Sequence, residues 1–307
     1  MVERIALESI VVGVSDGEVS DEAVRAGLDL GRRFGASIEL VHAVAVPYPI
    51  WTSVDSSFPA ASNAEALTAA WKHQTGRLGR LLGDRLGERT IEDVLRVLPG
   101  PTAKVLLARA SQLKADLIVL GPHSRRSLFD FGSTARGVLA MAPCDVWVQP
   151  VPFGPIRRLL VPIDLSAESA HVLAKARWLA ASLGAAVRTL HCWSTPALAA
   201  SQGLGLGYPL AGPSCSFDDA RDATQAEFEQ TVAAFDWGDV PNEAVFLEGE
   251  PTRSILEEQG SADLIVMGTH GRTGLGAAVL GNVAYGVLKS AELPVLAIRH
   301  PHRGRGA

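Results

Sequence analysis

The stretch that decides the fold is Ala262–Leu288, ADLIVMGTHGRTGLGAAVLGNVAYGVL. It opens with the apolar run Leu264–Met267, which ends at Gly268 and is typical of a fully buried strand in a parallel sheet. A glycine-rich segment follows, and after Asn282, a good helix N-cap, the apolar residues are spaced to fit one helix face. Glycines let a ligand approach the backbone, and a helix N-terminus offers N–H groups to an anion. The stretch therefore predicts a strand, a loop and a helix that together hold a phosphate group.

The glycine spacing resembles a known pattern. Gly268-x2-Gly271-x9-Gly281-Asn282 is similar to the motif of the universal stress protein family, G-x2-G-x9-G followed by Ser or Thr. In that family the motif holds the ribose and phosphates of ATP. The chain departs from the pattern at Asn282, where an amide that can still donate a hydrogen bond stands in place of a hydroxyl.

Length and composition bound the class of protein. The 307 residues suffice for two domains of about 150 residues. A net charge of −5 gives no electrostatic footprint for nucleic acid, and no apolar run is long enough to predict a membrane span. The N-terminus is not typical of a secretory signal, and the three scattered cysteines argue for a reducing compartment. We therefore expect a cytoplasmic protein without nucleic-acid or membrane partners.

An internal repeat with a period near 150 residues runs through the chain. The linker lies near Pro150 to Pro155, which predicts one domain over 1–153 and another over 154–302. The matched segments are Ser9–Ser15 with Arg158–Asp164, Leu98–Thr102 with Leu247–Thr252, Ala115–Gly121 with Ala262–Gly268, and Ala142–Val148 with Ala291–Ala297.

Strands and helices alternate in each half, which predicts an α/β fold with a parallel sheet and helices on both faces. The resemblance implies two tandem doubly wound domains, each with five strands in the order 3-2-1-4-5. It also implies that the last strands, Val146–Gln149 and Val295–Ile298, pair across a pseudo-two-fold, with a homodimer as an open alternative. Other expected elements are a helix over Asp21–Phe34, strands over Ser37–Val44 and near Ile91–Val97, a helix over Ala167–Leu183, and strands over Val187–Trp193 and Glu243–Leu247.

Two long segments, Pro47–Ser62 and Thr195–Phe217, follow the second strand of each half. Segments of this length are either lids or surface insertions without a specific role. The resemblance places them near the nucleotide.

The second half carries the fuller site. Val161–Ser166, VPIDLS, resembles the family's Pro-x-Asp-x-Ser, which implies that Asp164 accepts hydrogen bonds from adenine or ribose, whereas its simpler role is to cap the next helix. Ser166 is the expected N-cap of that helix. His191 is either a satisfied core histidine or a ligand contact. The nucleotide-binding residues that the resemblance implies are Pro162, Ile163, Asp164, His191, Met267, Gly268, His270, Gly271, Arg272, Gly281, Asn282 and Val283.

The first half has a degenerate version of this site. Ser124 replaces the middle glycine, the spacer before Gly132 is two residues short, and Ser15 aligns with Asp164, although Asp16 is adjacent. Arg125 and Arg126 could still attract an anion. We expect ATP to bind the second half and to bind the first weakly or not at all.

Three functions remain open. The first is an ATP-binding stress-response or regulatory protein, with Mg²⁺ arriving on the nucleotide. The second is a nucleotide-free interaction or dimerisation module. The third is an adenine-nucleotide-dependent enzyme, against which the chain has no Ser-Gly-Gly-x-Asp-Ser or P-loop motif and no assignable catalytic set. At most slow ATP hydrolysis is expected, because His270 has no orienting acid visible in the sequence.

Overall fold

The computed structural model describes residues 5–15, 20–44, 60–82, 86, 89–121, 133–194, 217–269 and 280–299. The chain divides into two compact units, with the division between Phe153 and Gly154. Each unit is described below by itself. The domain limits 1–153 and 154–302, and the pairing of the last strands, stay predictions.

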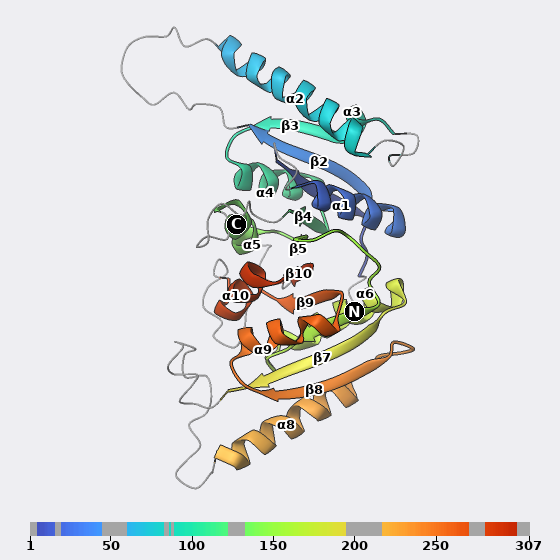
Figure 1. The fold of residues 1–307 in the computed structure, drawn as a ribbon, viewed down its shortest axis with the longest axis vertical. Helices are drawn as coiled ribbons and strands as arrows, with labels where there is room; N and C mark the ends of the chain where they lie inside the picture. The colour runs from blue at the N-terminus through green and yellow to red at the C-terminus, as the bar shows by residue number, and fades with distance from the viewer. Residues whose placement is uncertain are drawn as a thin grey trace, which may run out of the picture. The chain divides into compact units, whose positions relative to one another are not determined.

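The first unit is a parallel sheet in the order β3-β2-β1-β4-β5 (Figure 1). Its elements are β1 Ser9–Val14, α1 Asp21–Phe34, β2 Ser37–Val44, α2 Ala60–Leu82, α3 Ile91–Val94, β3 Leu95–Pro99, α4 Thr102–Leu113, β4 Leu117–Leu120, α5 Ser133–Met141 and β5 Asp145–Val148.

The second unit repeats this topology with the order β8-β7-β6-β9-β10, again parallel (Figure 1). The expected α/β fold and the 3-2-1-4-5 order are thus confirmed. The elements are β6 Arg158–Pro162, α6 Ser169–Leu183, β7 Ala186–Trp193, α8 Phe217–Ala234, β8 Asn242–Glu248, α9 Pro251–Glu258, the short 3₁₀ turn Gln259–Ser261, β9 Leu264–Gly268, α10 Asn282–Ser290 and β10 Val295–Ile298.

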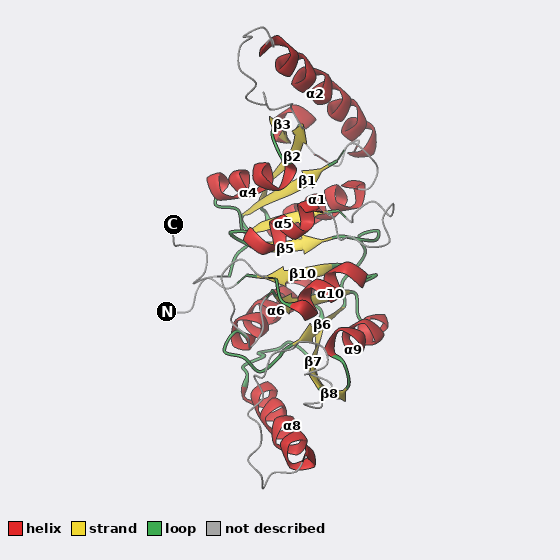
Figure 2. Ribbon diagram, turned by 90° about the vertical axis from the view of Figure 1, so that its left-hand side faces the viewer, coloured by secondary structure: helices red, strands yellow, loops and turns green. Residues whose placement is uncertain are grey.

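Helices cover both faces of the sheet in each unit (Figure 2). In β2, Ile38 lies so close under α1 that a Cβ on Gly31 would stand 2.2 Å from its Cδ1. The next residue, Glu39, forms an ion pair with Arg109 of α4. Successive side chains of a strand point to opposite faces, so α1 and α4 cover opposite faces of this sheet.

An aspartate ties together the starts of two central strands in each unit. Asp116, just before β4, accepts the N–H groups of Glu8 and Ser9 at 2.8 and 3.0 Å. Asp263, just before β9, accepts the two N–H groups at the start of β6 at 2.8 and 2.9 Å. Because these bonds lie at the amino ends of the strands, the opposite, carboxyl ends are left for the site.

Some expected boundaries were wrong. The strand predicted near Ile91–Val97 begins as the helix α3 and becomes extended only at Leu95. The cause is a capping box, in which Asp93 accepts both the N–H and the hydroxyl of Thr90, at 2.8 and 3.0 Å. Of the long segments expected to be loops, residues 47–59 and 195–216 lie outside the described residues, while Ala60 and Phe217 already begin helices.

Candidate functional site

The candidate site lies where the strand order of the second unit reverses. The first strand, β6, pairs with β7 on one side and with β9 on the other. The chain leaves β6 towards α6 and leaves β9 towards α10, so their carboxyl ends form the switch point at which open α/β sheets bind ligands. Pro162 ends β6 and is followed by Ile163 and Asp164, and Met267 and Gly268 end β9.

Asp164 is fixed by a tight turn. Its Oδ1 accepts the Ser166 N–H at 3.0 Å and the Ser169 hydroxyl at 3.3 Å. Between them, Leu165 has a φ of 61°, a left-handed conformation that a leucine rarely adopts. Strained backbone of this kind collects at ligand sites. Ser166 is therefore part of the Asp164 turn, and its prediction as the helix N-cap was wrong, because α6 begins at Ser169 after Glu168.

His191 is a buried residue that holds the end of β6. Its side chain is 4% exposed, and its Nδ1 lies 2.8 Å from the carbonyl oxygen of Ile163. A carbonyl only accepts, so Nδ1 carries the proton. The ring stacks against Phe228 and Phe246, each at 5.7 Å. His191 thus fixes the carbonyl group next to Asp164 by a hydrogen bond, which agrees with the core-histidine alternative.

The next residue on β7, Cys192, stays a neutral thiol. Burial is the largest of the causes that together raise the pKa of Cys192 to about 12; a hydrogen bond with Ser254 lowers the pKa, and Glu250 and Glu258 contribute to raising it. The thiolate is the nucleophilic form of cysteine, so this group does not act as a nucleophile at neutral pH.

The two ends of the glycine loop meet. The backbone oxygen of Thr269 accepts the Gly281 N–H at 2.9 Å, and the Thr269 hydroxyl donates to Ile298 at 3.4 Å. Gly281 is the N-cap of α10, with φ −61° and ψ 148°, angles open to any residue. Asn282 is the first helical residue and is exposed, so its prediction as the N-cap was wrong.

Gly281 places no side chain at the N-cap of α10. Ser, Asp or Asn at Gly281 would normally accept an N–H of the first turn. With glycine there, the N–H groups of Asn282 and Val283 are not taken by an N-cap side chain. Since the backbone angles do not demand glycine, the lack of a side chain is what glycine contributes at this position.

The structure brings together most of the predicted site residues. Pro162, Gly268, Gly281 and Val283 are half-buried at the strand ends and helix start. Ile163 and Met267 are 7% and 5% exposed and face the core, so they support the site. His270, Gly271 and Arg272 lie outside the described residues, as do Ser124, Arg125, Arg126, Gly132 and Asp16 of the first half.

Comparison with known proteins assigns the chain to a family. The model of the universal stress protein family matches residues 7–150 and again 155–299. The chain belongs to the universal stress protein family.

Its relatives have either one or two such units. Universal stress protein Rv2005c of Mycobacterium tuberculosis is 25% identical over 304 residues, covering 94% of this chain and 96% of its own. Universal stress protein YxiE of Bacillus subtilis is 30% identical over 148 residues, which is 46% of this chain and 98% of its own. The crystal structure of a universal stress protein from Archaeoglobus fulgidus has a TM-score of 0.65 at 15% identity, covering 95% of this chain and 96% of its own. Relatives of one unit and of two units therefore both occur.

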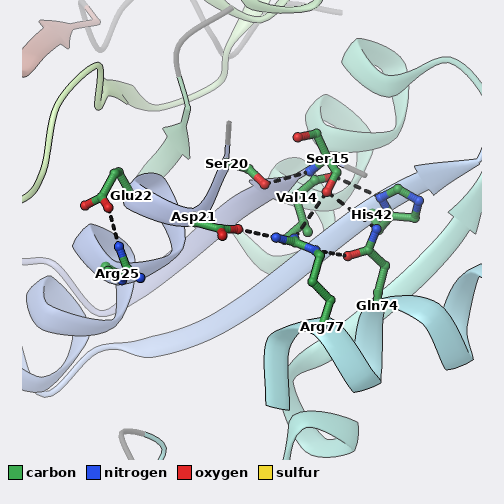
Figure 3. Close-up of polar contacts among 9 residues, drawn as sticks. All are labelled: Val14, Ser15, Ser20, Asp21, Glu22, Arg25, His42, Gln74 and Arg77. Carbon is green, nitrogen blue, oxygen red and sulfur yellow. Dashed lines mark hydrogen bonds and ion pairs between the residues drawn. The ribbon is translucent and has the colours of Figure 1, made fainter. Parts of the chain in front are cut away.

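The first universal stress protein unit has different groups at the same strand ends. There, Ser15 follows β1 and donates its N–H to the Ser20 hydroxyl at 3.0 Å. Gln74 and Arg77 of α2 reach its carbonyl oxygen, and Arg77 also pairs with Asp21 (Figure 3). Sequence reasoning missed the roles of Asp21, Gln74 and Arg77, because only the fold brings α2 to the end of β1.

Within the described ranges, no group of three or more His, Cys, Asp or Glu residues is arranged to hold a metal ion. None of the described helices has the length and hydropathy needed to cross a membrane.

Proposed function

We propose that the chain is a cytoplasmic ATP-binding protein of the stress-response or regulatory class, with the nucleotide held at the strand ends of the second unit. The observation that carries this proposal is the start of α10. A glycine stands at its N-cap although its backbone angles are open to any residue, and the first-turn N–H groups have no N-cap side chain. A helix start without an N-cap side chain leaves its first-turn N–H groups accessible to a phosphate group.

The phosphate end of the nucleotide fits the residues present. The N–H groups of Asn282 and Val283 would donate to phosphate oxygens, and the helix dipole favours their negative charge. The contact between Thr269 and Gly281 holds the two ends of the glycine loop together. Mg²⁺ would be carried by the phosphates, as it commonly keeps several waters and few protein ligands.

The base and ribose of the nucleotide fit the end of β6, the strand next to β9. Asp164 would accept hydrogen bonds from a ribose hydroxyl or the base amino group, both of which donate. Its direction is fixed by the turn through Leu165 and by the Ser169 hydroxyl. His191 keeps the Ile163 carbonyl in place beside it. Pro162, Gly268 and Gly281, at the strand ends and the helix start, are half-buried.

A second candidate is a nucleotide-free interaction module. The observation that favours it is Asn282, which stands where the family motif has a hydroxyl and which is exposed at the helix start. An enzyme is the weakest candidate, since the described part of the site offers Asp164 in a structural turn and a buried, stacked His191. Turnover of ATP is therefore expected to be slow or undetectable.

Nucleotide released from the freshly purified chain tests the proposal. The protein is denatured, and the supernatant is analysed by ion-pair chromatography and mass spectrometry. We expect adenine nucleotide, mainly ATP, at up to one molecule per chain, and much less from the Gly281→Val variant. Absence of nucleotide from the purified wild-type chain, together with no binding of added ATP at 1 mM, would favour the interaction module.

A further inference from the structure

Two side chains of α2 contact the carboxyl end of β1 in the first unit (Figure 3). Arg77 donates from Nη2 to the carbonyl oxygen of Ser15 at 3.2 Å and forms an ion pair through Nη1 with Asp21, the first residue of α1. Gln74 donates from Nε2 to the same carbonyl at 3.4 Å and accepts from Arg77 Nε at 3.0 Å. One guanidinium and one amide thus satisfy both the strand end and the start of the next helix.

The three side chains of this network are largely buried, whereas Ser15, whose carbonyl oxygen accepts from Arg77 and Gln74, is exposed. The side chains of Arg77 and Asp21 are 13% and 15% exposed, and Gln74 is 0% exposed. Breaking a mostly buried ion pair by removing one partner is strongly destabilising, because the other charge is left uncompensated. Arg77 is therefore a fixed part of the first unit, unlike Arg80, which is exposed on the same helix.

Its position matches the ligand site of the second unit. Ser15 is the repeat counterpart of Asp164, and the residue before it has the same support in both units. His42 lies 3.0 Å from the carbonyl oxygen of Val14, just as His191 lies 2.8 Å from that of Ile163. Arg77 and Gln74 therefore contact the first unit where the base or ribose of a nucleotide would contact the second.

The second unit differs at the strand end and at the start of the next helix. Its helix serine, Ser169, donates to the strand-end carboxylate, whereas Ser20 accepts the N–H of Ser15. The carboxylate of the first unit lies instead on α1, at Asp21. In the second unit the helix after the long segment, α8, places Phe228 against His191. The negative charge of Asp21 is neutralised by its ion pair with Arg77.

We propose that Arg77 is a built-in ligand of the first unit. Its planar guanidinium, together with the Gln74 amide, presents N–H donors to the acceptors at the strand end, as the amino edge of a base would. Arg77 and Gln74 then take the place of the base or ribose in the first unit, and only the second unit binds nucleotide. This last clause rests on the proposed function, whereas the self-occupied site does not.

Chemical rescue of Arg77→Ala in the full chain tests the built-in ligand. Truncation to Ala removes the equivalent of ethylguanidinium, which is the probe. Hydrogen exchange of residues 64–82 of α2 should become roughly tenfold faster or more in the variant. Ethylguanidinium at about 10 mM, far below denaturing concentrations, should restore most of the protection. The matched control Arg80→Ala should exchange like the wild type with and without the probe.

Two outcomes would overturn the built-in ligand. One is unchanged exchange of α2 in Arg77→Ala, and the other is equal stabilisation of Arg77→Ala and Arg80→Ala by the probe. If Arg77→Ala does not fold, Asp21→Asn replaces it, because this change removes the charge but keeps the size. Faster exchange of α2 in Asp21→Asn supports the network, and wild-type exchange refutes it.

Added ATP separates this inference from the proposed function. In the wild-type chain, ATP should protect peptides at the start of α10 and leave α2 unchanged. Protection of α2 by ATP would show that nucleotide enters the first unit and would refute self-occupation. Protection of neither unit would refute the proposed function, while the rescue experiment would still decide the role of Arg77.

Discussion

Replacement of Asp164 by Asn separates two roles of this carboxylate. Asn keeps one carbonyl oxygen for the Ser166 N–H and the Ser169 hydroxyl, now 3.0 and 3.3 Å from Oδ1, but it loses the charge. The cost to the fold should be below about 1 kcal/mol, or less than about 4 °C in Tm. A charge-assisted hydrogen bond to the ligand is worth about 1.5–3 kcal/mol, so the Kd for ATP should rise roughly 10- to 150-fold.

Comparison with Asp164→Ala makes this measurement specific. Alanine removes the acceptor for both donors, which should cost about 1–3 kcal/mol and lower Tm by roughly 2–12 °C. Ser15→Ala is the matched control in the first unit, because the contacts described for Ser15 use its backbone. Calorimetric titration with ATP and differential scanning calorimetry give both quantities. If Asp164→Asn binds ATP as tightly as the wild type, Asp164 serves only the turn and the assignment of the base end is wrong.

Three further predictions concern packing and titration. Gly286→Val should destabilise the second unit by about 1–3 kcal/mol in urea unfolding, because even a Cβ would stand 2.6 Å from Thr252 Cγ2. A stability equal to that of the wild type would mean that α9 and α10 can separate without cost. Cys192 should react with iodoacetamide far more slowly than a free thiol at pH 8, because burial raises its pKa to about 12, and rapid labelling of folded protein would contradict this raised pKa. Hydrogen bonds from Thr90 lower the pKa of Asp93 below its ordinary 3.8, so the stability it adds is present above that pH and is lost as the pH falls through the lowered value; Asp93→Asn should therefore flatten the stability curve below about pH 4, and parallel curves for the two proteins would rule this out.

The strands and helices of the fold were predictable from the sequence because their signals are local, whereas the strand order was implied by the family resemblance. Buried parallel strands read as continuous apolar runs, such as Leu264–Met267, and these alternate with helical spacing in both halves. The repeat doubled the number of observations for each element. The switch point then followed from the topology, and the glycine loop marked it.

Helix starts were harder to place, for a physical reason. Ser166 and Asn282 are both good N-caps by residue type, yet neither is one. Ser166 donates its N–H to Asp164 in a turn that depends on the left-handed Leu165, which no residue preference predicts. At α3 a helix start was missed. The capping-box residues Thr90 and Asp93 are visible in the sequence, but the β-rich run around them predicted a strand.

The network around Arg77 lay beyond sequence reasoning. Arg77 is separated by 56 residues from Asp21 and by 62 residues from Ser15. Only the packing of α2 over the sheet brings these groups together, and an arginine on a surface helix is ordinarily solvated. The signal that could have raised the question was the loss of the strand-end acid at Ser15, since a lost ligand group invites a search for its replacement.

The stoichiometry of ATP binding tests the central claim most directly. Calorimetric titration of the wild-type chain should give one site per chain. Gly281→Val should abolish most binding, because its backbone angles accept valine while the side chain blocks the helix start, and Gly132→Val should change binding little. Two equal sites per chain, or loss of binding only in the Gly132 variant, would contradict the assignment of the nucleotide to the second unit.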